Sequence, residues 1–274
     1  MPDKYRGVIP IVDRRGGIPP GFRSGAEPRD YNEFPDEMMQ SPSEMTLVPR
    51  SEWDARFDED NETGASLEHI FLGGTALNRP AFVNLEQNGH GACWAYSTGH
   101  CIMLKRLAAG LPYIRLNPHS VFAIIKGGRD EGGWAGLSAK FMRENGIAIE
   151  GEAVDQWPLH SRNTRRDTPQ LRASMARFKI EEDWYDVSRR EWDQKMTIDQ
   201  IATQLMMNNP VAADFKWWGH SVALLRLVRI EAGEWGWLML NSWKGWGHHG
   251  LAVIRESEMM PMGAVAIRTT TMSV

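Results

Sequence analysis

A cysteine and a glutamine just upstream of it are the residues of this sequence best suited to carry chemistry. Cys93 stands in the run Gly-Ala-Cys-Trp-Ala-Tyr-Ser at 91–97, and Gln87 precedes it by six positions. The glycine permits a tight turn, and the cysteine is predicted to open a long helix, where backbone N–H groups and the helix dipole favour a thiolate. The glutamine amide is a suitable donor to an oxyanion formed beside the sulfur. The alternative is a buried, inert cysteine, because most free cysteines are buried.

A histidine and an asparagine flank a predicted β-hairpin. His220 precedes the apolar run 222–230, a second apolar run covers 235–240, and Asn241 follows it directly. A turn signal between the two runs indicates antiparallel pairing, which brings both flanking residues to one end of the sheet. The asparagine amide can fix the tautomer of the imidazole, and the imidazole can take a proton from a thiol. The residues alone do not place Cys93 opposite this pair.

Taken together, these segments resemble the papain-like cysteine peptidases. In that family a glutamine lies six residues before Cys-Trp-Ala-aromatic-Ser, a histidine precedes an apolar strand, and an Asn-Ser-Trp block precedes a Gly-Trp turn. Here Asn-Ser-Trp occupies 241–243 and Gly-Trp-Gly occupies 245–247. Four blocks match the family and follow its order over residues 80–255. The fourth block is a double glycine, described in the next paragraph. The resemblance implies a nucleophile at Cys93, a base at His220, its orienting residue at Asn241 and an oxyanion donor at Gln87.

The same resemblance implies which residues contact a substrate. The family lines one wall of its cleft with a double glycine, which corresponds to Gly132 and Gly133. The residue after that pair and the residues beside the histidine help to form the subsite for the second residue before the cut. Those positions are Trp134 and Trp218, whose indoles would either favour an aromatic or aliphatic side chain or crowd the pocket. Trp243 would shield the contact between the histidine and the asparagine from water.

The function implied is that of a cysteine endopeptidase. It would hydrolyse peptide bonds of a peptide or protein substrate through a Cys-His-Asn triad and a thioester acyl-enzyme, with no metal and no organic cofactor. One alternative is a papain-fold structural or assembly module, for example a component of a virion, with little or no peptidase activity. A long proline-rich arm motivates that alternative. Another is acyl transfer to an amine other than water.

Cysteine usage and hydropathy bear on the compartment. Cys93 and Cys101 are the two cysteines of the 274 residues. On one helix their Cα atoms would lie about 12 Å apart, beyond the ~7 Å limit for a disulfide. No apolar run approaches the ~20 residues of a membrane span, and the start lacks the apolar core of a signal peptide. We therefore expect a cytoplasmic or other reducing compartment, with a virion as the alternative, and no membrane partner.

Metal and nucleic-acid sites are not expected. Two histidines lie near the cysteines, at His90 and His100, but the four side chains do not converge as a closed zinc site requires. The arginines at 162–166 stand beside an acidic residue without interleaved aromatics, which is typical of a solvated loop rather than a nucleic-acid surface.

The sequence divides into an arm and a domain. Residues 1–65 hold 14 acidic and 8 basic residues and eight of the 15 prolines. We predict an extended acidic arm over 1–65, with a short helix from Ser51, capped by that serine, to about residue 60. The alternative for 1–45 is disorder. The arm would act as a prosegment, would bind a protein partner, or would lie in the chain's own cleft. Residues 66–274 would form the papain-like domain.

The fold class follows from the order of the predicted elements. Helices dominate the first half of the domain and antiparallel strands the second, which predicts an α+β fold. The resemblance adds that the cleft lies between a helical half with a central helix and a sheet half. The predicted helices are 93–109, 137–144 and one that a capping box opens at Thr197. Besides the hairpin, the predicted strands are 211–213, 251–255 and 264–268.

Overall fold

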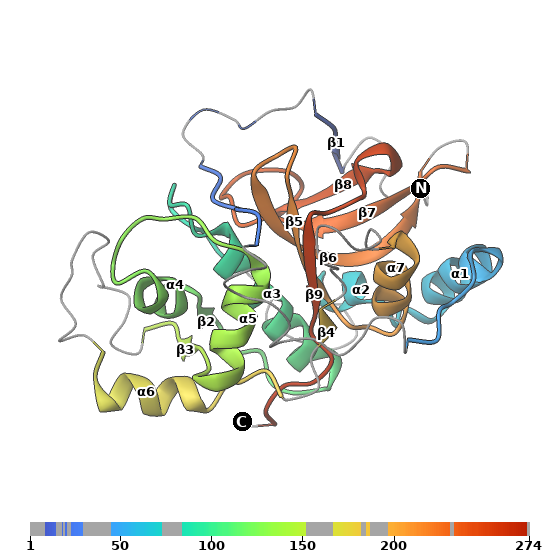
Figure 1. Cartoon of the computed structure of the whole chain (residues 1–274). Coiled ribbons are helices and arrows are strands. Elements are labelled where there is room, and N and C mark those ends of the chain that lie inside the picture. Colours follow the sequence, from blue (N-terminus) through green and yellow to red (C-terminus); the bar gives the residue numbers. More distant parts are fainter. Residues whose placement is uncertain are drawn as a thin grey trace.

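The structure is a computed structural model, and part of the chain is described in it. The described residues are 9–14, 18, 20, 23–29, 45–72, 84–151, 167–181, 185–186, 197–230 and 233–272. The arginine cluster at 162–166 and most of the predicted arm before residue 45 lie outside them. The described part is built on a sheet, with a group of helices on one face and the helix α7, Ile198–Met206, packed against the other (Figure 1).

The helical layer is built around α3, Cys93–Ala108. This helix packs against the sheet on one side and against α5, Ala135–Glu144, on another. Two further helices complete the layer, α4 at His119–Ile125 and α6 at Pro169–Ala176. Two short strands lie among these helices and form an antiparallel pair, β2 at Leu116–Asn117 and β3 at Ala148–Ile149 (Figure 1). Fourteen of the 16 residues of α3 are buried, so this helix is a core element covered on all sides.

A seven-stranded sheet forms the other layer, with the order β1-β8-β7-β6-β5-β9-β4. Its pairs are antiparallel except that β1 runs parallel to β8. The strands are β1 (Ile11–Val12), β4 (Tyr185–Asp186), β5 (Val211–Phe215), β6 (His220–Arg229), β7 (Trp235–Leu240), β8 (Leu251–Arg255) and β9 (Gly263–Ala266). The edge strand β1 belongs to the predicted arm, which is thereby joined to the sheet (Figure 1).

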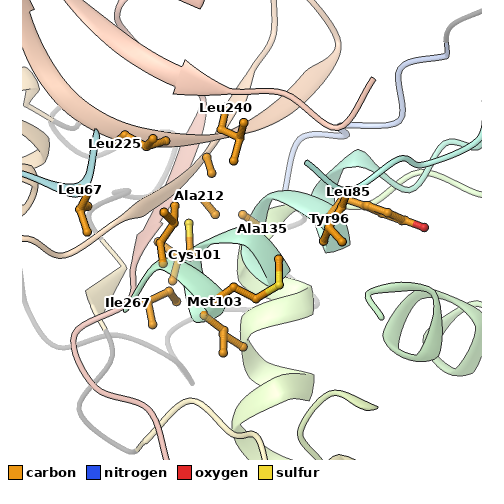
Figure 2. Close-up of a cluster of buried hydrophobic side chains, with 14 of the residues drawn as sticks. Leu67, Leu85, Tyr96, Cys101, Met103, Ala135, Ala212, Leu225, Leu240 and Ile267 are labelled. Atoms are coloured by element: carbon orange, nitrogen blue, oxygen red, sulfur yellow. The ribbon is translucent and has the colours of Figure 1, made fainter. Parts of the chain in front are cut away.

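Apolar side chains fill the space between α3 and the sheet. Figure 2 shows part of this cluster, in which Cys101 of α3 lies with Ala212 of β5 and Ile267. Both cysteines are free, and Cys101 is fully buried among these neighbours. Burial raises its pKa well above the ordinary value. Cys101 is therefore a packing residue, as a small apolar side chain would be.

A polar contact attaches the end of the predicted arm to the sheet. The helix α1, Trp53–Thr63, ends at Gly64, and a short helix α2, Leu67–Phe71, follows it. Arg226 of β6 is 3% exposed, and its guanidinium donates to the carboxylate of Glu68 in α2 at 3.0 Å and to the carbonyl of Phe57 in α1 at 2.9 Å. A buried charge is stable only when it is paired in this way. The segment 53–71 is thus held to the body of the molecule by a buried ion pair.

The principal predicted elements are present, with differences at their ends. Helix α7, Ile198–Met206, opens with the predicted capping box at Thr197. Helix α1 begins two residues after Ser51, and its N-cap Glu52 makes no side-chain capping bond, so the predicted serine cap is wrong. A 3₁₀ turn over Arg50–Glu52 precedes α1 and includes Ser51. None of the described helices is both long and apolar enough to cross a membrane.

Candidate active site

Cys93 is the first residue of α3 and is fully buried. Burial raises the pKa of its thiol to about 12, and the charge of Asp214 adds to that rise. Backbone N–H groups of Ser221, Gly25 and Trp94 act in the opposite direction, because they hydrogen-bond to the sulfur. The contact with Ser221 places the sulfur beside the residue that follows His220. The helix start and the hairpin therefore meet at this thiol.

His220 and Asn241 meet at the end of the hairpin. His220 opens β6, and Asn241 directly follows β7. The imidazole Nε2 and the Asn241 Oδ1 lie 2.7 Å apart, so Nε2 carries the proton of a neutral imidazole and donates it to the amide oxygen. The Nδ1 atom is buried and has no hydrogen-bond partner among the described residues. The ring thus presents an open proton acceptor at Nδ1, as a general base requires.

Both the thiol and the imidazole are neutral in this environment. Burial lowers the pKa of His220 to about 4, although the hydrogen bond to Asn241 raises it. At neutral pH a thiol with a pKa near 12 is protonated and an imidazole with a pKa near 4 is not. The thiolate that the helix start was expected to favour is therefore not the state that the described structure favours. Desolvation outweighs the helix N-terminus and the nearby N–H groups.

Aromatic rings enclose the histidine. Trp243 stacks on His220 with centroids 4.3 Å apart, and Trp218 meets the same imidazole edge-on at 4.9 Å. Trp217 stacks on Trp218 at 5.4 Å, and Trp246 packs against Trp243 at 5.8 Å. These rings exclude water from the His220–Asn241 hydrogen bond, which strengthens it.

Gln87 is fixed by the Asn-Ser-Trp block. Its backbone N–H donates to the carbonyl of Ser242 at 3.0 Å, and its side-chain oxygen accepts from the Ser242 hydroxyl at 2.6 Å. Its amide nitrogen therefore points the other way, where it donates to the carbonyl oxygens of His90 and Arg23. The amide that was predicted to donate to an oxyanion thus donates instead to the backbone carbonyl of Arg23 in the predicted arm, at 3.1 Å.

Residues 23–27 of the arm contact several of the predicted site residues. The Gly133 N–H donates to the Gly25 carbonyl at 2.8 Å, and the Gly133 carbonyl accepts from the Glu27 N–H at 2.7 Å. This is a parallel β-bridge between Ala26 and Gly133. On the other side, the Ala26 N–H donates to the carbonyl of Gly219, next to His220, at 3.0 Å. The segment therefore spans from the double glycine to the histidine strand, over the buried thiol.

Glycine is required at the points where this segment approaches the body. A Cβ atom on Gly25 would lie 2.1 Å from the carbonyl oxygen of Gly91, which is backbone and cannot move aside. A Cβ atom on Gly133 would lie 2.7 Å from the ring of Trp94, which is fully buried. A Cβ atom on Gly132 would meet the carboxylate of Glu27. Gly132 therefore permits the arm to approach closely, and Gly133 permits the Trp94 ring to pack against it. The contact of this pair with a substrate stays a prediction.

The two tryptophans predicted to bind substrate differ in their surroundings. Trp134 lines a small cavity of about 10 Å³ together with Asp214, Met262 and the arm residues Glu27 and Arg29. Trp218 does not line that cavity; it is 4% exposed and belongs to the aromatic group around His220. The contact of either indole with a substrate stays a prediction.

Three residues take part in the site that the sequence analysis did not single out. Ser242 orients Gln87, as described above. Asp130 is 6% exposed, accepts from the Gly91 N–H at 2.8 Å and pairs with Arg23 of the arm at 2.6 Å. Trp217 extends the aromatic group. Ser242 lies in the Asn-Ser-Trp block and could have been found from the sequence. The role of Asp130 is evident only from its contact with the arm. Among the described residues no group of three or more histidine, cysteine or acidic side chains is placed to hold a metal ion.

Comparisons with known proteins rest on structure alone. No protein-family profile matches the sequence, and no curated protein matches it. Xylellain, a cysteine protease from Xylella fastidiosa, is similar with a TM-score of 0.58 and 14% identity, over 91% of this chain and 96% of that one. Procathepsin B S9 from Trypanosoma congolense is similar with a TM-score of 0.57 and 15% identity, over 90% and 86%.

The proform of the ragweed pollen allergen Amb a 11, a cysteine protease, is also similar. Its TM-score is 0.51 at 16% identity, and the match covers 68% of this chain but only 62% of that one. The chain therefore has the α+β fold of the papain-like cysteine proteases.

Proposed function

We propose that this chain is a cysteine endopeptidase in which Cys93 is the nucleophile, His220 the base, Asn241 its orienting residue and Gln87 the oxyanion donor. The observation that carries the proposal is the hydrogen bond of 2.7 Å between His220 Nε2 and Asn241 Oδ1, which leaves Nδ1 open. The sulfur lies against the backbone of Ser221, one residue from that base. A buried, oriented base beside a thiol is the arrangement that nucleophilic catalysis needs.

The reaction would proceed in two stages. The Cys93 thiol gives its proton to His220 Nδ1 as the sulfur attacks the peptide carbonyl carbon, and the oxyanion accepts from the Gln87 amide and the Cys93 N–H. His220 then passes the proton to the leaving amine, the C–N bond breaks, and a thioester remains. Water attacks the thioester after giving a proton to His220, and that proton returns to the sulfur as the acid product leaves. Asn241 holds the ring in one tautomer throughout.

We further propose that the arm keeps this site closed. The family resemblance puts the residues before the cut beside the double glycine, and in the mechanism above the cleaved carbonyl lies at Gln87. A substrate would therefore run from Gly133 towards Gln87 in the N-to-C direction. The arm runs the other way, because Arg23 meets Gln87 and the later residue Ala26 meets Gly133. A reversed chain uses the same hydrogen-bond groups but runs opposite to the direction expected of a substrate, so the arm would act as a block and not as a substrate.

An assembly module is the second candidate function. The observation in its favour is that both catalytic groups are neutral, with a thiol pKa of about 12 and an imidazole pKa of about 4. If the arm never leaves, the thiol would stay protonated, and the fold would serve only as a rigid body. The two candidates therefore differ in one property, which is whether displacement of the arm yields cleavage.

The test compares three proteins on a diverse peptide library. Gly25→Ala places a Cβ atom against the Gly91 carbonyl and should displace the arm. Wild type and the double variant Gly25→Ala, Cys93→Ala are the matched controls. Cleavage products formed by Gly25→Ala and lost in the double variant would establish the peptidase. If Gly25→Ala leaves every peptide intact while Cys93 is freely alkylated by iodoacetamide, the peptidase proposal is wrong. Mass spectrometry of the protein's own N-terminus shows whether the arm is trimmed.

A further inference from the structure

Two buried serine side chains, Ser97 and Ser221, join α3 to β6 next to the catalytic groups. Their hydroxyl oxygens lie 2.7 Å apart, and each residue is 1% exposed. Ser97 stands four residues after Cys93 in α3, and Ser221 stands one residue after His220 in β6. This serine pair therefore links the helix of the nucleophile to the strand of the base, about one helical turn from the sulfur.

Ser221 contacts α3 at two points. Its backbone N–H hydrogen-bonds to the Cys93 sulfur, and its hydroxyl bonds to Ser97 one turn further along the same helix. Residues four apart lie on one face of an α-helix, so both contacts come from the face that packs against β6. One contact would let the strand pivot about it, whereas two contacts along the helix axis fix its direction as well. The main chain of β6 is thus held to α3 at the residue that follows His220.

The next side chains of β6 on this face are apolar. Ala223 and Leu225 follow Ser221 at two-residue steps, which puts them on the same face of the strand. Both belong to the apolar cluster that contains Cys101 of α3. Apolar packing has no directional preference, so it stabilises the contact without fixing where the strand lies along the helix. A hydrogen bond between hydroxyls holds only over about 2.5–3.0 Å, so the serine pair supplies the positional constraint that packing lacks.

The imidazole of His220 is held from the sheet side by other residues. Asn241, which follows β7, lies 2.7 Å from its Nε2 atom, and Trp243 stacks on its face. These contacts fix the ring relative to the sheet and not relative to α3, which carries the thiol. The separation between the base and the nucleophile therefore depends on how β6 lies on α3. The serine pair is placed to set that separation.

We propose that Ser97 and Ser221 are positioning residues that hold His220 Nδ1 within proton-transfer reach of the Cys93 thiol. The inference rests on the peptidase function proposed above and adds two residues that take no proton in its mechanism. Loss of both hydroxyls would let the start of β6 shift on α3 and lengthen the path from the sulfur to the imidazole. A misplacement of about 1 Å can lower a catalytic rate by about 100-fold.

The test removes both hydroxyls together, because a single alanine would deprive the other buried hydroxyl of this partner. Ser97→Ala, Ser221→Ala is made in the arm-displaced Gly25→Ala protein, and peptide cleavage is measured. We expect kcat to fall about tenfold and KM to change by less than about twofold, since proton transfer belongs to the chemical step. The single variant Ser221→Ala should lower kcat in the same way. A rise in KM with kcat unchanged would overturn the proposal.

A second buried hydroxyl pair on the same helix supplies the matched control. Thr98 of α3 and Ser138 of α5 also lie 2.7 Å apart and are fully buried, but they join α3 to α5. Ser97 and Thr98 both donate to the Trp94 carbonyl as well, at 3.2 and 3.1 Å, so the two pairs match in this contact too. Thr98→Val, Ser138→Ala should lower the thermal midpoint about as much as the serine double variant and leave kcat unchanged. Equal losses of kcat in the two double variants would mean that the serine pair only stabilises the fold.

A measurement that needs no cleavage separates this inference from the peptidase function. The rate of iodoacetamide labelling of Cys93 is measured at pH 7 in the Gly25→Ala protein, with and without the serine pair, in the His220 and His220→Ala forms. Loss of the pair should slow labelling about fivefold more when His220 is present, because any change in solvent access affects both forms alike. Equal effects in the two forms would overturn the positioning role. The expected difference without cleavage of any peptide would keep that role and reject the peptidase.

Discussion

The two sides of the catalytic groups differ in how they contact an extended chain. On the Gly133 side, the N–H and the carbonyl of one glycine are both paired with arm residues Gly25 and Glu27. On the Trp246 side, the loop 244–250 makes its backbone hydrogen bonds to itself and to its neighbours and leaves a cavity of about 740 Å³. The first side is filled by backbone, whereas the second is open and lined by side chains.

This difference determines what each side can hold. Backbone pairing to a glycine accepts any extended chain, in either direction, because it requires no particular side chain. The Gly133 side can therefore hold the protein's own arm as readily as a substrate. On the Trp246 side the loop already uses its backbone groups for its own hydrogen bonds, so an extended chain would meet side chains instead.

The largest effect that this comparison predicts is a steep pH dependence of thiol reactivity in wild type. With the arm in place, burial raises the pKa of Cys93 to about 12, so only the small thiolate fraction reacts. That fraction, and with it the rate of iodoacetamide labelling, should rise about 1,000-fold between pH 7 and pH 10. Mass spectrometry of the Cys93 peptide measures the rate. A plateau near pH 9, as for an ordinary thiol, would contradict the buried site.

The local structure around the candidate site residues was largely predictable from the sequence. Cys93, Gln87, His220 and Asn241 lie in short segments whose local structure depends on neighbours in the chain: a helix start, a turn and a hairpin. Strong local signals fix such elements, which is why α3, α7 and the hairpin were correctly placed. Their convergence on one point required the family resemblance, because no spacing in the sequence determines long-range contacts.

The features that the sequence did not predict were missed for physical reasons. The segment 23–29 carries no periodic pattern, and it is held largely by backbone hydrogen bonds, which leave little pattern in a sequence. Helix α6 was missed although Thr168 caps it and Pro169 opens it, because its eight residues show little amphipathic pattern. The neutral state of Cys93 and His220 was missed for a different reason. It depends on burial in the folded molecule, where Gly25 and Ser221, both distant in the sequence, contact the Cys93 sulfur.

The second prediction concerns displacement of the arm from Gly133, which would open the side that the arm fills. Gly25→Ala should raise the labelling rate of Cys93 at pH 8 about 100-fold, because solvent reaches the thiol and its pKa falls. Gly245→Ala is the matched control on the open side. No atom lies within 4 Å of its new Cβ, so it costs only the strain of a φ of +69°. Labelling of Cys101 should stay slow in both, and equal Cys93 rates in the two variants would refute the arm block.

Orientation of Gln87 by Ser242 is the third prediction. Ser242→Ala removes the hydroxyl that donates to the Gln87 side-chain oxygen at 2.6 Å, which frees the amide to rotate. In the Gly25→Ala background we expect kcat about tenfold lower with KM little changed, since an oxyanion donor acts in the transition state. Ser51→Ala, at an exposed position far along the chain, should change neither constant. A rise in KM alone would mean that Ser242 serves substrate binding instead.

The smallest predicted effect concerns an ion pair that joins the arm to the body of the molecule. Arg23 pairs with Asp130 at 2.6 Å, but its side chain is 64% exposed, so water and salt screen the attraction. Arg23→Gln should raise Cys93 labelling by about fivefold or less, because exposed pairs contribute up to about 1 kcal/mol. Asp130→Asn should act more strongly, since this carboxylate also accepts from the Gly91 N–H at 2.8 Å and so fixes the turn before Cys93. If Arg23→Gln matched Gly25→Ala in its effect, the arm would be held by charge and not by its backbone, and the division between a backbone side and a side-chain side would fail.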